Sequence, residues 1–388
     1  MANVSSSNGL EKRPKLRFPG FDEPWKKCEF KEFAKVNPKC QSIPEQFYYI
    51  DLGSVEDGEL SNAKIENALS APSRAQRLLS CNDVLFQTVR PYQQNNYLFC
   101  KERSLPTVAS TGYAVFRTKY DVPFLYALIH TGHFLNSVLS RCTGTSFPAV
   151  SASDIEDILV SIPSLGEQQK IGELFRLLNS KIRKQKALIE SLKKYKRGVT
   201  EAIFTKDLRF TTKGVPYPQW DKKYVGDICK IQTGKSNTQD ETSQGSYPFY
   251  VRSPIIRKSN RYLFDCEAVL TVGDGVGTGK VFHYVTGKFD LHQRVYAMTD
   301  FKIVSGKYFY YYFSHFFYDR VMRMTAKTSV DSVRYEMIDK MTIQIPCHEE
   351  QQQIVSFLDC LEHSVIEAEK TLNLLEKLKS GCLQQLFI

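Results

Sequence analysis

Two segments of the chain carry the same pattern of hydrophobic and polar positions. The segment 162–204 returns at 345–387 without a gap, at an offset of 183 residues (345 − 162). In both copies hydrophobic residues recur at alternating spacings of four and three, and both place a lysine, Lys196 or Lys379, at the same position of this register. A heptad pattern sustained over this length is typical of coiled-coil helices. The repeat therefore predicts two long, related helices.

The two predicted helices carry opposite charge. Residues 165–205 contain ten Lys and Arg against four Asp and Glu, whereas residues 348–388 contain three against seven. Charges that flank a coiled-coil seam set partner choice, so pairing of the two helices with each other is favoured over pairing of either with itself. Two unrelated amphipathic helices with solvated charged faces remain an alternative.

The composition is that of a globular protein with more than one domain. The chain has 388 residues, of which 42% are hydrophobic and 24% charged. No apolar run is long enough to span a bilayer, and the polar, Ser-rich residues 1–13 are expected to be a flexible tail and not a signal peptide. The ten cysteines lack Cys-x-x-Cys spacing, which favours reduced thiols over disulfides or zinc. The net charge of +10 permits a polyanionic partner.

Each predicted helix follows a block that opens on one of the two tryptophans, Trp25 and Trp220. Runs of β-branched and aromatic residues within the blocks predict strands, and longer apolar stretches predict helices. The fold class expected is mixed α/β, with two related globular domains that alternate with two long helices. The predicted strands are 47–52, 84–89, 112–116, 268–272, 281–285 and 293–298, and the predicted shorter helices are 122–139 and 308–324.

The sequence contains no complete catalytic or nucleotide-binding motif. The glycine-rich loop 273–280 departs from the dinucleotide fingerprint at its sixth position. The tripeptide 234–236 resembles the end of a phosphate-binding loop, but Cys229 occupies the place of that motif's first glycine. Asn/Asp-Pro-Pro-aromatic, which amino-methyltransferases use, is also missing. We expect no catalysis by the chain itself, while a catalytic set assembled only by folding stays open.

Polar and basic side chains gather on the predicted loops that link the strands. Arg and Lys can contact phosphates or guanine edges, and Asn and Gln can read adenine. Each of these residues taken alone is better explained as a solvated surface residue. The hypothesis that they contact DNA therefore rests on the residues considered together. The candidate DNA-contact residues are Gln87, Arg90, Tyr92, Gln93, Asn95, Ser146, Lys235, Arg252, Asp274, Lys280, Gln293, Arg294, Lys327, Ser329 and Arg334.

Over essentially its whole length the chain resembles the specificity subunits of type I restriction–modification systems. The most specific marks are Ile-Pro-x-x-x-Glu-Gln-Gln-x-Ile at 162–171 and again at 345–354, and the stretch Lys-Lys-Tyr-Lys-Arg-Gly that ends at Gly198. The resemblance implies that the two helices run antiparallel as a coiled coil. The domains it implies are a flexible tail at 1–13, target-recognition domains at 14–164 and 207–347, and conserved spacer helices at 165–206 and 348–388.

The resemblance also implies a function. Each recognition domain would read one half of a bipartite, asymmetric site in double-stranded DNA, and the helices would set the spacing between the halves. Two methyltransferase subunits would bind S-adenosylmethionine, and restriction subunits would bind ATP and Mg²⁺, while the chain itself would hold no catalytic residue, cofactor or metal. The complex would be cytoplasmic, in a bacterium or archaeon, without a membrane partner. The expected docking residues for the methyltransferase subunits are Glu167, Gln168, Gln169, Glu350, Gln351 and Gln352.

Two functions from other classes stay open on the sequence alone. One is a DNA-modifying enzyme with an unrecognised site, which would form an S-adenosylmethionine-dependent product by itself. The other is a coiled-coil adaptor whose globular domains bind protein, and this function would be favoured if the chain showed no sequence-selective DNA binding.

Overall fold

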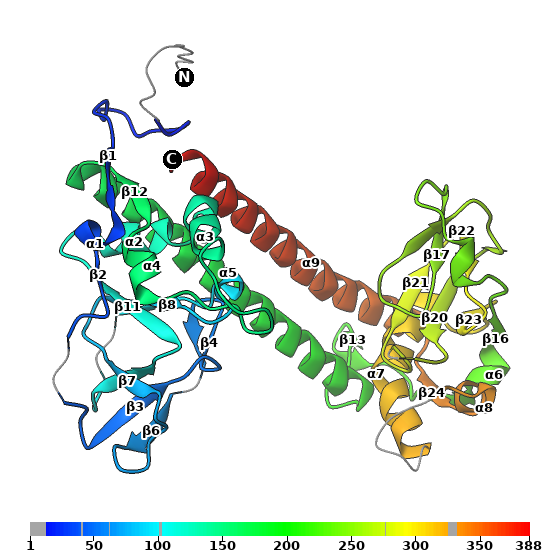
Figure 1. Ribbon diagram of the computed structural model, residues 1–388. Coiled ribbons are helices and arrows are strands. Elements are labelled where there is room, and N and C mark those ends of the chain that lie inside the picture. Colours follow the sequence, from blue (N-terminus) through cyan, green and yellow to red (C-terminus); the bar gives the residue numbers. More distant parts are fainter. Residues whose placement is uncertain (1–12, 40–41, 62, 101–102, 276, 325–331) are drawn as a thin grey trace. The chain divides into compact units, whose positions relative to one another are not determined.

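The structure is a computed structural model that describes residues 13–39, 42–61, 63–100, 103–275, 277–324 and 332–388 (Figure 1). The chain forms two compact units. The first comprises residues up to Lys186 together with Lys370–Ile388, and the second comprises Ala187–Glu369. Each unit contains one globular domain and a part of each of the two long helices.

The domain of the first unit is built on two four-stranded sheets. Their strand orders are β2-β11-β8-β9 and β6-β3-β10-β7, and the two remaining strand pairs are β1-β12 and β4-β5. The strands are β1 (Lys26–Glu29), β2 (Lys35–Val36), β3 (Gln46–Ile50), β4 (Val55–Glu56), β5 (Glu59–Leu60), β6 (Lys64–Asn67), β7 (Ala75–Leu78), β8 (Asp83–Gln87), β9 (Tyr97–Phe99), β10 (Thr107–Ser110), β11 (Tyr113–Arg117) and β12 (Leu159–Ile162). The helices are α1 (Phe30–Phe33), η1 (Pro91–Gln93), α2 (Val122–Leu128), α3 (Gly132–Leu139), α4 (Ala152–Glu156) and the start of α5 (Leu165–Phe204).

The domain of the second unit has the sheets β16-β23-β20-β21 and β18-β17-β22-β19, with the strand pairs β13-β14 and β15-β24. Its strands are β13 (Thr211–Thr212), β14 (Val215–Pro216), β15 (Asp221–Tyr224), β16 (Lys230–Thr233), β17 (Tyr247–Tyr250), β18 (Arg257–Ser259), β19 (Phe264–Asp265), β20 (Ala268–Val272), β21 (Phe282–Val285), β22 (Lys288–Leu291), β23 (Val295–Thr299) and β24 (Thr342–Ile345). Its helices are α6 (Val225–Ile228), η2 (Thr238–Asp240), α7 (Gly306–Met324), α8 (Tyr335–Asp339) and the start of α9 (His348–Gln385).

The second domain repeats the sheet topology of the first. Strands β16-β23-β20-β21 correspond to β2-β11-β8-β9, and β18-β17-β22-β19 correspond to β6-β3-β10-β7. The correspondence extends to single contacts, because the isolated bridge Val89–Ala149 of the first unit recurs as Asp274–Ser332 in the second. The duplication seen in the helices thus includes the two globular domains, although their sequences differ, and the predicted mixed α/β class is confirmed.

One predicted element is wrong in its extent. The apolar stretch 122–139 forms two helices, α2 and α3, and not one. The break lies at Thr131, whose hydroxyl donates to the Leu128 carbonyl at 2.8 Å and accepts from the Phe134 N–H at 3.2 Å. A threonine that accepts from the backbone in this way caps a new helix. The corresponding segment of the second domain, α7, is continuous.

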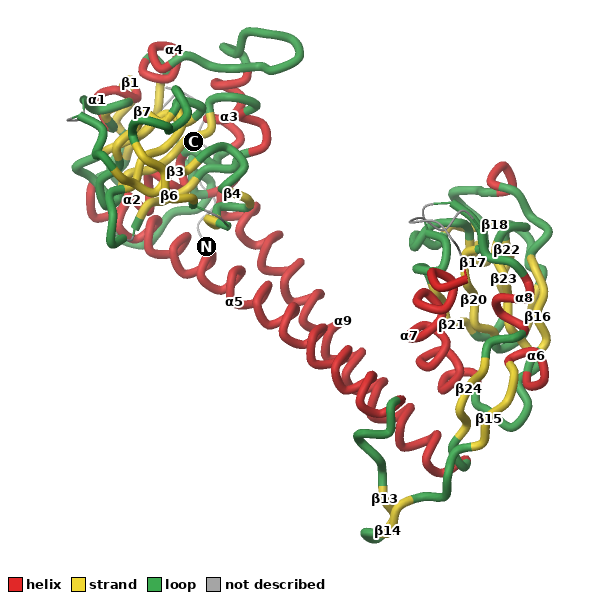
Figure 2. Tube along the Cα trace, turned by 90° about the horizontal axis from the view of Figure 1, so that it is seen from below, coloured by secondary structure: helices red, strands yellow, loops and turns green. Residues whose placement is uncertain are grey.

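Within each unit α5 and α9 pack side by side in opposite directions (Figures 1 and 2). In the first unit Lys186 pairs with Glu376 at 3.9 Å. In the second unit Lys193 pairs with Glu369 at 2.8 Å, and an ion pair joins two residues nearer its domain, Lys196 and Glu362. The positions spaced by four and three are buried or half-buried along both helices, and they are 171, 175, 178, 182, 185, 189, 192, 196, 199 and 203 in α5 and the same positions plus 183 in α9, the last of them, 386, just beyond its end. The predicted seam and the pairing of the basic helix with the acidic one are therefore confirmed.

A phenylalanine at the end of α5, Phe204, and one just beyond the end of α9, Phe387, each enter a globular core. In the second unit Phe204 is 2% exposed and its ring centroid lies 5.0 Å from that of Tyr312. In the first unit the ring centroid of Phe387 lies 5.3 Å from that of Phe124 and 6.1 Å from that of Trp25. Burial of a phenylalanine contributes about 2 kcal/mol of hydrophobic stabilisation. Each domain core is thus closed by the end of the helix that follows the other domain in sequence.

Candidate nucleic-acid interface

In the second domain three loops meet around one carboxylate. Arg252 lies with Nη1 3.4 Å from Asp274 Oδ1, and Arg294 lies with Nε 3.7 Å from Asp274 Oδ2. The backbone of the Asp274 loop is joined to that of Arg294, because the Gly273 N–H donates to the Arg294 carbonyl at 2.8 Å. The arginine side chains are 49% and 62% exposed. Two guanidinium groups are therefore positioned near one point of the surface, where they can donate to phosphate or guanine oxygens.

A buried histidine supports this loop. His292 is 4% exposed, and its Nδ1 accepts from the Arg294 N–H at 3.0 Å. Burial lowers the pKa of His292, and the positive charge of Arg252 lowers it further. The ring is therefore neutral near pH 7, which keeps Nδ1 free of a proton and able to accept.

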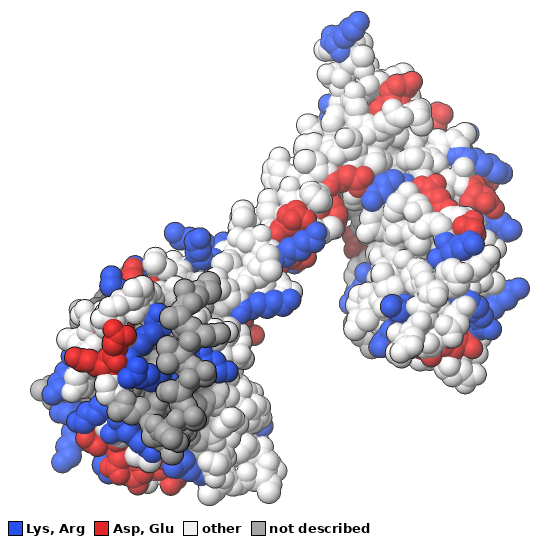
Figure 3. Space-filling model, turned by 90° about the horizontal axis from the view of Figure 1, so that it is seen from above, with Lys and Arg blue, Asp and Glu red and all other residues white. Residues whose placement is uncertain are grey.

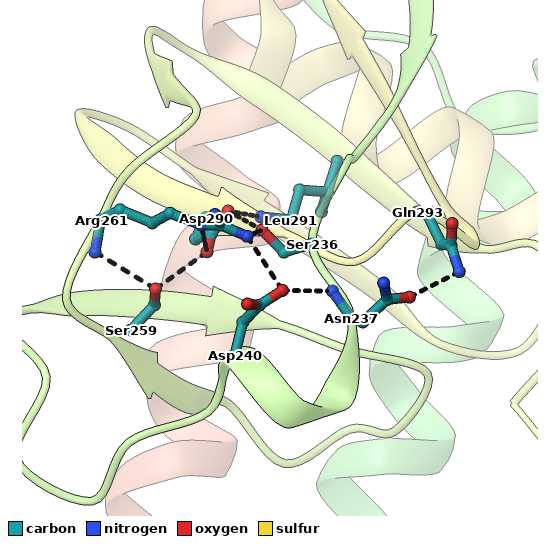
Figure 4. Close-up of polar contacts among 8 residues, drawn as sticks. All are labelled: Ser236, Asn237, Asp240, Ser259, Arg261, Asp290, Leu291 and Gln293. Carbon is teal, nitrogen blue, oxygen red and sulfur yellow. Dashed lines mark hydrogen bonds and ion pairs between the residues drawn. The ribbon is translucent and has the colours of Figure 1, made fainter.

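Two positions before His292 in the chain lies a buried carboxylate whose hydrogen bonds are satisfied by three chain segments (Figure 4). Asp290 is 0% exposed and accepts from the hydroxyls of Ser236 at 2.7 Å and Ser259 at 2.9 Å, and from the Leu291 N–H at 2.9 Å. The Nε of Arg261 lies 3.6 Å from it. Because a buried charge is tolerated only when it is hydrogen-bonded and paired, this network ties the three segments to one another.

The segment around Ser236 is joined directly to the loop before β23. The Ser236 N–H donates to the Leu291 carbonyl at 3.1 Å, and the Gln293 N–H donates to the Ser236 carbonyl at 2.9 Å. This close approach requires Gly234, since a Cβ there would collide with the Leu291 carbonyl. At the exposed end of the contact, Gln293 Nε2 donates to Asn237 Oδ1 at 2.6 Å. Gly234 thus permits backbone packing and is not part of a phosphate-binding motif.

The corresponding loop of the first domain follows β8 and is held by Gln87. Gln87 is 2% exposed, and its Nε2 donates to the Val89 carbonyl and to Gln93 Oε1, both at 2.8 Å. Its Oε1 accepts from the Asn95 N–H at 3.1 Å. The prediction that Gln87 reads bases does not fit this position, because its amide is buried and already used within the loop. Gln93 itself is exposed, and Asn95 is half-buried.

Arg90 lies on the same loop and stacks on an aromatic ring. Its guanidinium carbon is 4.4 Å from the centroid of Phe147, a ring that is 64% exposed. Its backbone has a φ of +54° and its N–H donates to the Pro148 carbonyl at 2.7 Å. Ser146 is exposed beside Phe147, and Tyr92 is 52% exposed on the loop of Arg90. Arginine and aromatic groups are thus presented together at the surface of the first domain.

The structure gives fewer contacts for the remaining candidate DNA-contact residues. Lys235 and Arg334 are exposed, and Arg334 directly precedes α8. Lys280 is exposed with Nζ 5.1 Å above the Tyr318 ring. Lys327 and Ser329 lie outside the described residues.

Two of the glutamates predicted to dock methyltransferase subunits are buried within their own units. Glu350, in the first turn of α9, is 0% exposed and accepts from Arg209 Nε at 2.9 Å, from Arg209 Nη2 at 3.1 Å and from Trp220 Nε1 at 2.7 Å. In the first unit Glu167 forms the same contacts with Arg17 and Trp25. Each glutamate therefore fastens the start of its globular domain to the first turn of a long helix.

Two of the predicted docking glutamines are also internal. Gln168 Nε2 donates to the Pro163 carbonyl at 2.9 Å, and Gln351 Nε2 donates to the Pro346 carbonyl at 3.0 Å. Both side chains are 2% exposed, so they stabilise the turn between strand and helix. Only two of the six predicted docking residues are exposed, and these are Gln169 and Gln352.

The arginines of these glutamate clamps were missed by sequence reasoning, although a signal was present. The pair Arg17-Phe18 recurs as Arg209-Phe210, ahead of each tryptophan. The role of the repeated arginine depends on its partner, and for Arg209 that partner is Glu350, 141 positions away. No local sequence pattern spans such a separation.

Charges of both signs are distributed over the surface. On the face drawn in Figure 3, Lys and Arg side chains lie among Asp and Glu side chains on the second domain, and both signs adjoin one another on the helices. Within the described ranges, no group of three or more His, Cys, Asp and Glu could hold a metal ion. Nor does that part of the chain include a helix long and apolar enough to cross a membrane.

The fold defines a protein made of two copies of one α/β module, each continued by a long helix. The family model of the type I restriction modification DNA specificity domain matches residues 23–194 and again 217–379. The chain therefore belongs to this family, as its repeated Ile-Pro-x-x-x-Glu-Gln-Gln-x-Ile motif predicted.

Curated relatives agree with this assignment. The chain is 27% identical over 142 residues to the specificity subunit of the type I restriction enzyme EcoDI of Escherichia coli, a match that covers 37% of this chain and 31% of that protein. It is 21% identical over 293 residues to the specificity subunit of MjaIX of Methanocaldococcus jannaschii, covering 68% of this chain and 67% of that protein. The chain thus spans about a third of the length of the first of these relatives.

Solved structures share the fold. The S subunit of a type I restriction–modification system from M. genitalium superimposes with a TM-score of 0.68 at 12% identity, over 97% of this chain and 99% of that one. A chain from a type I R-M system studied for its complex assembly and conformational transition gives a TM-score of 0.54 at 20% identity, over 96% and 99%. At these identities the likeness supports the fold.

Proposed function

We propose that this chain is the DNA sequence-specificity subunit of a type I restriction–modification complex, with each globular domain reading one half of a bipartite site. The observation that carries the proposal is the duplicated module with dissimilar loops. Equivalent bridges, Val89–Ala149 and Asp274–Ser332, hold the loops that follow β8 and β20. The first loop presents Arg90 with aromatic rings, whereas the second presents the carboxylate of Asp274, to which two neighbouring loops bring Arg252 and Arg294. Two readers with one frame and different side chains suit a target with two different halves.

In this proposal the paired helices hold the two domains apart and so set the length of DNA between the half-sites. The glutamate clamps support such a role, because each fixes a helix to its own domain through a buried ion pair. The outer faces of the helices carry exposed apolar side chains, which favour a protein partner. They are Leu177, Leu188, Tyr195, Leu374 and Leu378, exposed by 50%, 48%, 55%, 67% and 53%.

The partners assigned to these faces are two methyltransferase subunits. Methylation of a base within duplex DNA needs a pocket for a flipped nucleotide, and the chain carries no methyltransferase motif. S-adenosylmethionine would accordingly be bound by the methyltransferase subunits, and ATP and Mg²⁺ by restriction subunits. The whole complex would work in the cytoplasm of a bacterial or archaeal cell.

The test is co-expression of this chain with the methyltransferase subunit of the same system, followed by sequencing of the host DNA for methyladenine. A bipartite motif that disappears without this chain is expected. Arg90→Ala should relax one half of the motif and Arg294→Ala the other, by about 1–3 kcal/mol of discrimination at the affected base pairs. Relaxation of both halves by one substitution would contradict the modular reading, and a stable complex without a motif would favour a protein-binding adaptor.

A further inference from the structure

The side chains of Asn237 and Gln293 face each other at the exposed end of the network around Asp290. Asn237 is half-buried, follows β16 and directly precedes η2; Gln293 is exposed and precedes β23. Gln293 Nε2 donates to Asn237 Oδ1 at 2.6 Å. In Figure 4 the other amide atoms of the pair, Asn237 Nδ2 and Gln293 Oε1, both lie above the bond that joins the two amides. The pair therefore offers one donor and one acceptor on one side.

This donor–acceptor pattern does not depend on which way the amides are turned. If both amides were rotated by 180°, Asn237 would donate to Gln293, and the outward atoms would again be one acceptor and one donor. Each amide uses one of its two polar atoms to hold the other amide. An amide nitrogen carries two N–H groups and an amide oxygen two lone pairs, so each amide keeps hydrogen-bonding capacity after this contact. Asn237 still presents Nδ2, and Gln293 still presents Oε1.

We propose that Asn237 and Gln293 act together as one reader of an adenine in the half-site of the second domain. In the major groove adenine presents the N7 acceptor and the N6 amino donor. The Asn237 amide nitrogen would donate to N7, and the Gln293 amide oxygen would accept from N6. Guanine presents two acceptors in the same places, so it would meet the Gln293 oxygen with an unpaired acceptor.

The surrounding structure is suited to hold such a pair in place. The Asn237 N–H donates to Asp240 Oδ2 at 2.7 Å, and Asp240 accepts from Arg261 Nη2 at 2.9 Å. Arg261 Nη2 also donates to the Ser236 hydroxyl at 3.0 Å, next to the buried Asp290. Asn237 is therefore anchored through its backbone N–H, and its side chain takes part in the capping box with Asp240 at the start of η2. A reader held this way loses little conformational freedom when it binds DNA.

The described residues of the first domain do not include such an arrangement. Its own amide contact, Gln87 with Gln93, uses a glutamine that is buried and whose polar atoms are all taken inside the loop. The strand position that pairs with Phe249 holds Asp290 in the second domain, whereas in the first domain Ala109 pairs with Ile50. The adenine reader is thus confined to one half of the site.

The inference rests on the proposed function, and its test uses the complex of this chain with its methyltransferase subunits, read out by sequencing of methylated DNA. Asn237→Ala and Gln293→Ala should each reduce the preference for adenine at the same single base pair by about tenfold. The double variant should be no worse than either single variant, because the two residues act as one unit. Gln293→Glu, which offers only acceptors, should lose the preference as well.

The matched control is Gln219→Ala, which removes an exposed amide next to β15 in the same unit and should leave the motif unchanged. Relaxation at two different base pairs, or retention of adenine in all variants, would overturn the paired reader while leaving the proposed function intact. If the unmodified complex shows no bipartite motif, the proposed function itself fails, and the adenine assignment fails with it.

Discussion

Glu350→Gln tests how strongly the second domain is fastened to its helix. The glutamate side chain is 0% exposed and accepts three hydrogen bonds, two from Arg209 and one from Trp220. Glutamine has nearly the same shape but no charge, and its amide NH₂ would face N–H donors that have no acceptor left. The substitution thus removes one partner of a buried ion pair while leaving the packing volume unchanged.

Breaking a buried ion pair by removing one partner costs about 3–5 kcal/mol. Arg209 is 23% exposed, and its Nη2 retains bonds to the Tyr217 and Pro218 carbonyls at 3.1 and 3.0 Å. Its charge is consequently not stranded completely, and the lower end of the range applies. We expect the free energy of unfolding of the second unit to fall by about 3 kcal/mol.

The assay is equilibrium unfolding in urea, followed by the fluorescence of Trp220 in a Trp25→Phe background. The control is Glu369→Gln, which removes a pair with Lys193 in the same unit at 2.8 Å, whose side chains are 48% and 49% exposed. Solvent screens that pair, so its loss should leave the midpoint nearly unchanged. If Glu350→Gln has no larger effect than Glu369→Gln, the clamp does not fasten the helix and the reasoning is refuted.

Two further perturbations address the first unit and the helix pair. Burial lowers the pKa of His130 to about 4 from an ordinary 6.5. The folded first unit therefore holds a neutral ring, and its free energy of unfolding is highest above about pH 6.5. Up to about 3 kcal/mol of that free energy is lost as the pH falls towards 4, because the unfolded chain binds the proton more tightly. The urea midpoint of the wild-type protein should fall with pH over this range, and the fall should be smaller in His130→Gln. If the variant shows the same pH dependence, groups other than His130 cause it. Lys193→Glu places a second carboxylate beside Glu369 and should lower the thermal midpoint slightly at low salt, by about 0.5 kcal/mol in free energy. Adding Glu369→Lys should restore the midpoint, and a double variant no more stable than the single one would show that the pair contributes nothing.

Local pattern accounts for the part of the fold that was predicted correctly. The heptad register and the charges lie along single helices, so α5 and α9 follow from the spacing of apolar residues, and their pairing follows from their opposite charge. Strand β20 lies at its predicted bounds and β8 lies within two residues of them, because each contains a run of three apolar residues, 268–270 and 84–86. The break at Thr131 was missed because a threonine within an apolar stretch does not reveal whether its hydroxyl caps a helix or faces a neighbour.

By itself the sequence determined the duplication, the two long helices, the class of fold and the family, since each is written as a repeated or periodic pattern. The tertiary structure decided which polar residues are available at the surface. Glu350 and Gln87 are polar residues at motif or loop positions, and only their burial and their hydrogen-bond partners show that they hold the structure together. Asn237 became part of a site only through Gln293, 56 positions away. The physical reason is that hydrogen-bonded constellations form between segments brought together by the sheets, and their geometry has no counterpart in local periodicity.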